Sequence, residues 1–167
     1  HDDDTFTQPI RDMIRHPLDK IYDEQNRLFQ RRNRKHRIVE GHGALLPEHI
    51  HVKGQTVIFL SPQEAQKKYA ILDAANDVAT FSVELLRQQE EELNSSFLDR
   101  YLRSSRDRTD MKPLLPVYQI YAALRLGVTS CEMRTAMAWT EEEREAFQQR
   151  AVQYFNIAVR FARQLPH

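Results

Sequence analysis

The chain has 167 residues, in which 24 Lys and Arg side chains balance 24 Asp and Glu side chains. This balance excludes a protein whose whole surface is tuned to polyanions, and it leaves room only for local basic patches. The length suits one domain that buries a core without a disulfide or a structural metal. Because only four residues are Gly and helix formers are plentiful, we expect a mainly α, bundle-like single domain over residues 1–167.

Cys131 is the only cysteine of the chain. An intrachain disulfide and a cysteine-rich zinc site are therefore excluded, and a reducing compartment fits the pattern. We expect a cytoplasmic protein, with a processed secreted or periplasmic chain as the alternative, since the sequence begins at His1. No apolar run approaches the roughly 20 residues that span a bilayer, so we expect no membrane insertion.

A first long helix is predicted from Pro17, after a short turn over residues 9–16, because Leu18, Ile21 and Phe29 fall at helical spacing. It ends in a stretch of cations with no acid between them, the basic stretch, which comprises Arg27, Arg31, Arg32, Arg34, Lys35 and Arg37. Cations at a helix C-terminus complement the helix dipole, and this gives the stretch a purely structural explanation. The alternative is a patch that binds an acidic partner or the phosphates of a nucleic acid.

Residues 49–60 predict a β-hairpin, because two runs rich in β-branched residues flank the turn signal Lys53-Gly54. An isolated hairpin is marginal in water, so we expect it to pack on helices or to pair with another chain. Three histidines lie in or beside it and are candidate metal ligands: His42, His49 and His51. No HExxH spacing and no second ligand cluster accompanies them, so we expect polar surface there and no cofactor.

A long central helix is predicted from Ser61 to about Arg103, opened by a capping box over residues 61–64. Its apolar residues recur at three- and four-residue steps, which indicates one buried face. Unbroken, this helix would be roughly 63 Å long, whereas a globule of this size is about 40 Å across. We expect a break at residues 94–96, Asn-Ser-Ser, with a projecting helix that pairs with another subunit as the alternative.

A polar linker over residues 103–113 is a candidate sub-boundary, beyond which we expect a three-helix C-terminal unit over residues 114–165. The predicted helices cover residues 117–126, 129–138 and 140–164. Gly127 separates the first two, a capping box at Thr129 opens the second, and residues 140–143 start the third with a cap.

The first of these junctions has the spacing of a helix-turn-helix over residues 117–138. Four polar residues would then face a DNA groove: Thr129, Ser130, Arg134 and Thr135. Glu132 and the acidic cluster at residues 141–143 would oppose phosphates, and a plain corner between two helices is the alternative.

No nucleophile elbow, P-loop, dinucleotide fingerprint or paired Glu-x-x-His motif occurs in the sequence, so we do not expect an enzyme. Our leading interpretation is a non-catalytic helical interaction or assembly module that binds protein partners or self-associates. The hairpin, the basic stretch and the central helix are its candidate contacts. The alternative is a DNA-binding regulator or a DNA-processing accessory factor that uses residues 117–138 and the basic stretch.

Overall fold

The computed structural model describes residues 7–60, 71–135 and 139–165. The elements in chain order are α1 (Gln8–Arg34), β1 (Ile38–Glu40), the 3₁₀ turn η1 (Pro47–His49), β2 (Ile50–Lys53), β3 (Thr56–Phe59), β4 (Ile71–Asp73), α2 (Ala74–Arg87), α3 (Glu91–Ser104), α4 (Arg108–Met111), α5 (Leu115–Arg134) and α6 (Glu141–Ala162).

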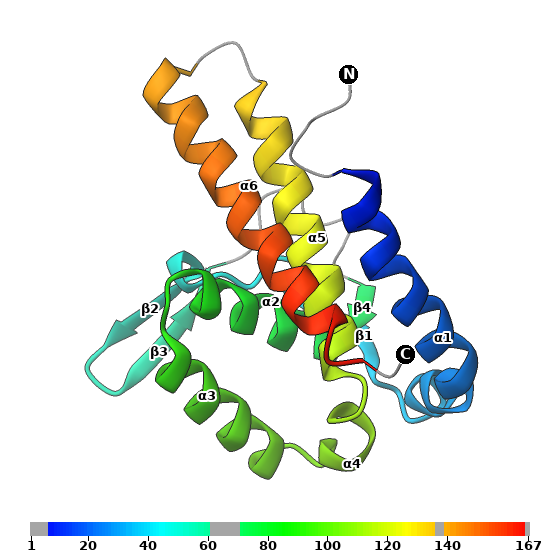
Figure 1. The fold of residues 1–167 in the computed structure, drawn as a ribbon. Coiled ribbons are helices and arrows are strands. Elements are labelled where there is room, and N and C mark those ends of the chain that lie inside the picture. The colour runs from blue at the N-terminus through cyan, green and yellow to red at the C-terminus, as the bar shows by residue number, and fades with distance from the viewer. Residues whose placement is uncertain (1–6, 61–70, 136–138, 166–167) are drawn as a thin grey trace.

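Helices dominate the fold, which confirms the prediction of a mainly α protein with a small hairpin. α5 and α6 run side by side, α2 packs against both, and α1 lies along the flank of α6 (Figure 1). The core between them is filled by apolar side chains such as Val83, Ile120 and Phe161, and α1 adds Ile14 and Ile21. None of the helices in the described part of the chain has the length and apolar character needed to cross a membrane.

α1 continues through Pro17 from Gln8 to Arg34, so the predicted turn before Pro17 is wrong. A proline inside a helix removes one backbone hydrogen bond and strains the preceding turn. Pro17 is buried on the same face as Ile14 and Ile21, three and four residues away. The packing of this apolar face offsets the lost hydrogen bond, and the helix is not interrupted.

The helix predicted for the central region begins later in the structure than the sequence predicts. The capping box at residues 61–64 lies outside the described residues, and Leu72 lies in strand β4 instead of on a helix. α2 begins at Ala74, because the carboxylate of Asp73 accepts a hydrogen bond from the backbone N–H of Ala75 at 2.9 Å. An aspartate in this capping position satisfies one of the free amides of the first turn.

The break in the central region lies at residues 88–90, and the predicted break at residues 94–96 is wrong. Gln89 adopts a left-handed backbone with a φ of 63°, which ends α2. Glu91 and Glu92 then stand in the first turn of α3, where negative charge is favourable. Asn94 is buried inside α3.

α5 is one helix from Leu115 to Arg134, so the predicted break at Gly127 is wrong. A Cβ atom built on Gly127 would lie 2.5 Å from Cε1 of Phe155 on α6. The glycine therefore allows close approach of two helices and does not form a turn. The described part of residues 114–165 holds two helices in place of the predicted three. The helix predicted from Thr140 is confirmed, since Thr140 caps α6 in a capping box with Glu143.

The predicted hairpin is confirmed, with Ile50 opposite Phe59 and Lys53 opposite Thr56. Its turn lies one residue later than expected, on Gly54 and Gln55. Gly54 has a φ of 63°, a backbone region that favours glycine. A second ribbon, in which β1 pairs antiparallel with β4, was not predicted, because strands of three residues carry too little periodicity.

The predicted linker at residues 103–113 contains α4 and packs against the body of the protein. Asp107, Asp110 and Met111 are all buried. A sub-boundary at this segment stays a prediction, as does the organisation in a single domain.

Candidate functional site

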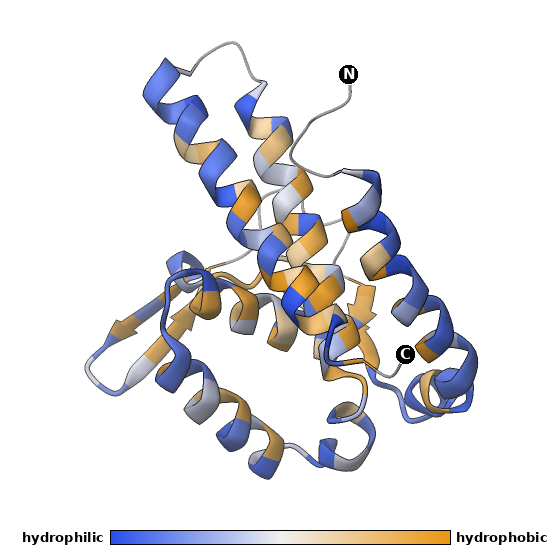
Figure 2. Ribbon diagram, in the orientation of Figure 1, coloured by the Kyte–Doolittle hydropathy of each residue, from blue (hydrophilic) through white to orange (hydrophobic). Residues whose placement is uncertain are grey.

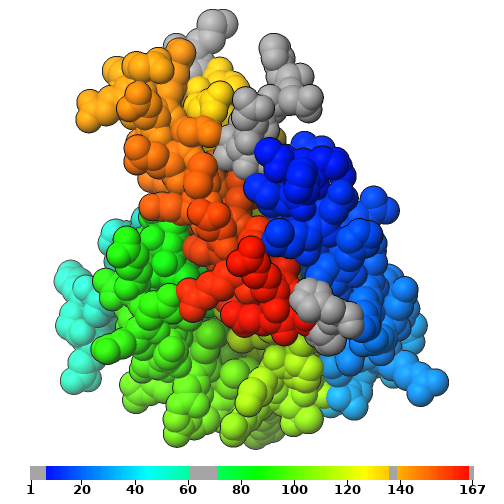
Figure 3. Space-filling model, viewed as in Figure 1, coloured from blue at the N-terminus to red at the C-terminus, as the bar shows by residue number. Residues whose placement is uncertain are grey.

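The β2–β3 hairpin exposes an apolar face to solvent. Residues that are directly opposite in an antiparallel pair point to the same side, so Ile50, Val52, Val57 and Phe59 share one side of the ribbon. Val52 is 70% exposed, Val57 52% and Phe59 58%. The ribbon lies at the edge of the molecule (Figures 1 and 3), and apolar colouring occurs on both strands (Figure 2). We call these four residues the hairpin face.

Hydrogen bonds tie the chain that leads into the hairpin to the start of α2. The carboxylate of Asp77 accepts the backbone N–H of His42 at 2.6 Å and that of Gly43 at 2.9 Å. The ring of His42 stacks on that of His49, with 5.1 Å between centroids. Nε2 of His42 lies 2.7 Å from the carbonyl oxygen of Leu60, at the end of β3.

Two of the three candidate metal ligands, His42 and His49, therefore meet in this anchor of the hairpin. Nδ1 of His49 lies 2.8 Å from the carbonyl oxygen of Ala44, which fixes the second ring. His51 stands on β2 opposite Ile58, on the side away from the hairpin face. Within the described ranges, no three His, Cys, Asp or Glu side chains gather as they would around a metal ion.

Most of the basic stretch is engaged inside the protein. Arg32 is fully buried, and its guanidinium makes two hydrogen bonds to Asp73, both at 2.7 Å. It makes two more to Asp107, at 2.8 and 2.9 Å. The hydroxyl of Tyr118 on α5 donates to Asp73 at 2.7 Å. This arginine thus joins the end of α1 to β4 and to the segment before α4.

The neighbours of Arg32 reach the same region from the surface. Arg31 and Lys35 both bind the buried carboxylate of Asp110, at 2.5 and 2.7 Å. Arg37 lies 3.5 Å from Asp107 and donates to the carbonyl oxygen of Arg106. The remaining members, Arg27 and Arg34, are exposed. The sequence does not reveal these pairs, because the partners lie 75 to 79 residues away for Arg31 and Lys35.

The cluster around Arg32 is ionic at neutral pH. Burial alone would raise the pKa of Asp73, but the hydrogen bonds from Arg32, Ala75 and Tyr118 hold that pKa below its ordinary value. Burial alone would lower the pKa of Arg32, whereas its bonds to Asp73 and Asp107 raise it above the ordinary value. The pKa of Tyr118 is raised by burial and by the adjacent charge of Asp73, so its hydroxyl keeps the proton that it donates.

A second buried polar cluster joins α2 to α6. Glu84 is 4% exposed, and its carboxylate accepts hydrogen bonds from Arg87, from Gln88 and from the hydroxyl of Tyr154. Burial alone would raise the pKa of Glu84, but these bonds hold it below its ordinary value. The three donors therefore stabilise the charged carboxylate inside the helical body.

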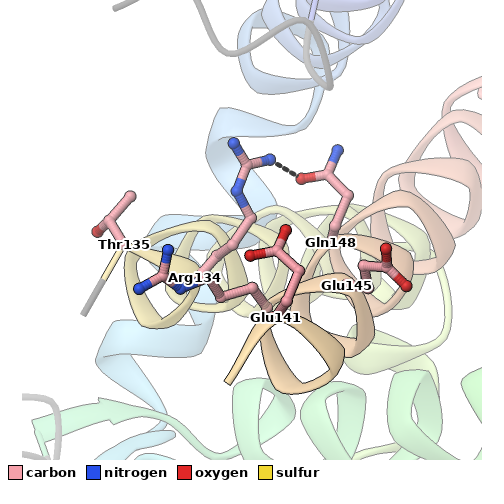
Figure 4. Close-up of a pocket in the computed structure, with 6 residues that line it drawn as sticks. Arg134, Thr135, Glu141, Glu145 and Gln148 are labelled. Carbon is pink, nitrogen blue, oxygen red and sulfur yellow. Dashed lines mark hydrogen bonds between the residues drawn. The ribbon is translucent and has the colours of Figure 1, made fainter. Parts of the chain in front are cut away.

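The four residues predicted to face a DNA groove lie along one helix and the turn that follows it. Ser130 is buried and donates to the carbonyl oxygen of Leu126, while Thr129 is exposed. Arg134 and Thr135 line a depression of about 520 Å³ whose other wall is α6 (Figure 4). Glu141 and Glu145 stand in that wall, and Arg134 is hydrogen-bonded to Gln148 across it (Figure 4). Arg144 lines it as well, so two arginines balance two carboxylates and the depression has no excess of positive charge for a phosphate backbone.

Comparison with protein-family models, with curated proteins and with solved structures finds no match to this chain.

Proposed function

We propose that this protein is a non-catalytic interaction module that self-associates through the hairpin face. The observation that supports it is the exposure of Val52, Val57 and Phe59 on one side of a ribbon that projects from the helical body. Contiguous apolar surface of this kind marks interaction sites in soluble proteins. A two-stranded ribbon is also marginal alone, so a second surface against its apolar side would stabilise it.

A second copy of the chain fits the hairpin face. All four residues of the face are apolar, so two copies can meet across a two-fold axis without bringing like charges together. The polar side chains of the ribbon, His51, Lys53 and Thr56, lie on its other side. Both strands have a free edge in the described sheet, which contains β2 and β3 alone. Face-to-face packing and edge pairing are therefore both open to the second copy.

The other predicted contacts are less suited to this role. Four members of the basic stretch, Arg31, Arg32, Lys35 and Arg37, are held by buried carboxylates of the same chain. DNA binding stays an untested alternative, but the depression beside Arg134 does not favour it, because Glu141 and Glu145 balance the charges of Arg134 and Arg144 there. We therefore assign partner contact to the apolar surface.

Sedimentation velocity over a range of protein concentrations tests this proposal. We expect the wild type to shift from monomer to dimer as concentration rises, and Val57→Lys to stay monomeric because it places a charge in the contact. Ile58→Lys is the matched control, because Ile58 is 44% exposed on the same strand but points to the opposite side. A wild type that is monomeric at every concentration would overturn self-association, and equal effects of the two lysines would overturn the assignment to the hairpin face.

A further inference from the structure

A cleft of about 420 Å³ lies between α1, β4 and α5, with the first turn of α2 beside it. Its walls include four aromatic rings, those of Tyr22, Phe29, Tyr118 and Tyr121. The rings of Tyr22 and Phe29 are 5.9 Å apart, and those of Phe29 and Tyr118 are 6.4 Å apart. Clefts of this size with apolar walls are typical of small-molecule sites, and aromatic walls favour a flat ring as the ligand.

The charges that line the cleft cancel. Asp73 and Arg125 are of opposite sign, and both are engaged within the chain. The carboxylate of Asp73 accepts two hydrogen bonds from Arg32 and one from the hydroxyl of Tyr118, each at 2.7 Å. The guanidinium of Arg125 donates to the hydroxyl of Thr80 at 3.3 Å and makes a further interaction. An ion in the cleft would give up its hydration without gaining an unpaired counter-charge, so the site suits an uncharged ligand.

One polar side chain in the wall lacks a partner for its buried oxygen. Asn76, in the first turn of α2, lines the cleft and is only 7% exposed. Its Oδ1 atom is buried and accepts no hydrogen bond from any residue that the structure describes. A half-turn about the last torsion exchanges Oδ1 and Nδ2 with little change in shape, so either atom can be presented to the cleft. Because an unpaired buried acceptor is unfavourable, a ligand that donates to this oxygen would stabilise the site.

We propose that this cleft binds a flat, uncharged aromatic molecule that carries an amide within its ring, a lactam. The ring of the ligand packs on Tyr22 and Tyr121, its N–H donates to Oδ1 of Asn76, and its carbonyl oxygen accepts from Nδ2. Tyr22 and Tyr121 are 61% and 52% exposed, so the ligand reaches the cleft between them without a rearrangement of the core. The hairpin takes no part in this site, and this proposal and self-association stand or fall separately.

Three matched probes test the chemistry of the ligand in a calorimetric titration of the whole chain. Quinolin-2-one is an uncharged lactam, coumarin has a ring oxygen in place of its N–H, and 2-oxoquinoline-4-carboxylate is the same lactam with an added charge. We expect quinolin-2-one to bind most tightly and coumarin to bind about tenfold more weakly, because the donor to Asn76 is lost. The carboxylate should bind more weakly than quinolin-2-one as well. Equal or reversed affinities, or no heat with quinolin-2-one, would overturn the proposal.

Two buried asparagines provide a matched pair of variants that locates the contact. Asn76→Leu keeps the size of the side chain but removes the amide, so it should bind quinolin-2-one and coumarin equally. Asn94→Leu is the control, because Asn94 on α3 is also 7% exposed with an unpartnered Oδ1, and it should keep the preference for quinolin-2-one. Circular dichroism checks that each variant is folded. A folded Asn76→Leu that keeps the preference would contradict the assignment.

A third variant tests the cleft without touching Asn76. Val117 lines the cleft on α5, and Val117→Trp fills it, so we expect binding of quinolin-2-one to be lost. Unchanged binding by folded Val117→Trp would place the ligand elsewhere on the protein and overturn the proposal.

Discussion

The cluster around Arg32 and the β2–β3 hairpin reverse the usual distribution of charged and apolar residues. Arg32, Asp73 and Asp107 are all buried, whereas Val52 and Val57 are largely exposed. The buried charges pair with one another, whereas Val52 and Val57 expose most of their surface in the part of the chain that the structure describes. The comparison teaches that the most charged segment of this sequence is held inside the fold by buried carboxylates, while apolar side chains of its most β-branched segment stay exposed in the single chain.

The largest effect is expected from breaking the buried cluster. Arg32→Met leaves Asp73 and Asp107 as buried charges without their cation, so we expect the free energy of unfolding to fall by about 3–5 kcal/mol. Urea unfolding followed by circular dichroism measures it. Arg34→Met is the control, because Arg34 is exposed two residues away on the same helix, and it should change stability by less than about 0.5 kcal/mol. Equal changes in the free energy of unfolding for the two variants would show that the buried ion pairs of Arg32 add no more stability than an exposed arginine does.

Acidification provides a second way to weaken the same cluster. The folded-state pKa of Asp73 is lowered, so its contribution to stability is present above the unfolded pKa of about 3.9 and is lost as the pH falls through the folded value. We therefore expect constant stability above about pH 5 and a decline below about pH 4. The deficit of Arg32→Met should shrink in acid, because protonated Asp73 is no longer an unpaired buried charge. A deficit that is the same at every pH would contradict this account.

A smaller effect is expected from the second buried cluster. Tyr154→Phe removes the hydroxyl that donates to Glu84 at 2.5 Å, while Arg87 and Gln88 remain as donors. We expect a loss of about 1–2 kcal/mol in the free energy of unfolding, the value of one hydrogen bond to a charged group. Tyr22→Phe, at an exposed tyrosine, should have no measurable effect. Equal free energies of unfolding for the two variants would show that the hydrogen bond from Tyr154 to Glu84 does not stabilise the fold.

The smallest change in the free energy of unfolding is expected from a substitution in the hairpin. Val57 is half-exposed in the single chain, so Val57→Lys should change its stability by less than about 0.5 kcal/mol when the protein is dilute. Thermal unfolding of wild type and variant at low concentration measures this. The same substitution is expected to abolish self-association, so a large loss of stability in the dilute protein would show that the residue belongs to the core.

Local signals in the sequence predicted part of this structure. The hairpin was predicted because Gly54 and the β-branched runs beside it determine a turn and two strands on their own. The start of α6 was predicted because Thr140 and Glu143 form a capping box within one helical turn. In both cases the residues that determine the element are close neighbours in the chain, so no tertiary contact is needed to infer it.

Contacts between distant residues could not be inferred. Arg32 finds Asp73 and Asp107 at separations of 41 and 75 residues, and no spacing in the sequence marks these pairs. In the sequence Gly127 predicts a turn, because its role in the structure, close packing under Phe155, depends on a helix that comes later in the chain.

Amide hydrogen exchange measured at low and at high protein concentration compares the two regions within one experiment. The account predicts that residues 50–59 exchange more slowly when the protein is concentrated, because a second copy covers the hairpin face, while residues 27–37 exchange at the same rate throughout. Slower exchange at residues 27–37 with an unchanged hairpin would contradict it, since the contact would then lie on the basic stretch.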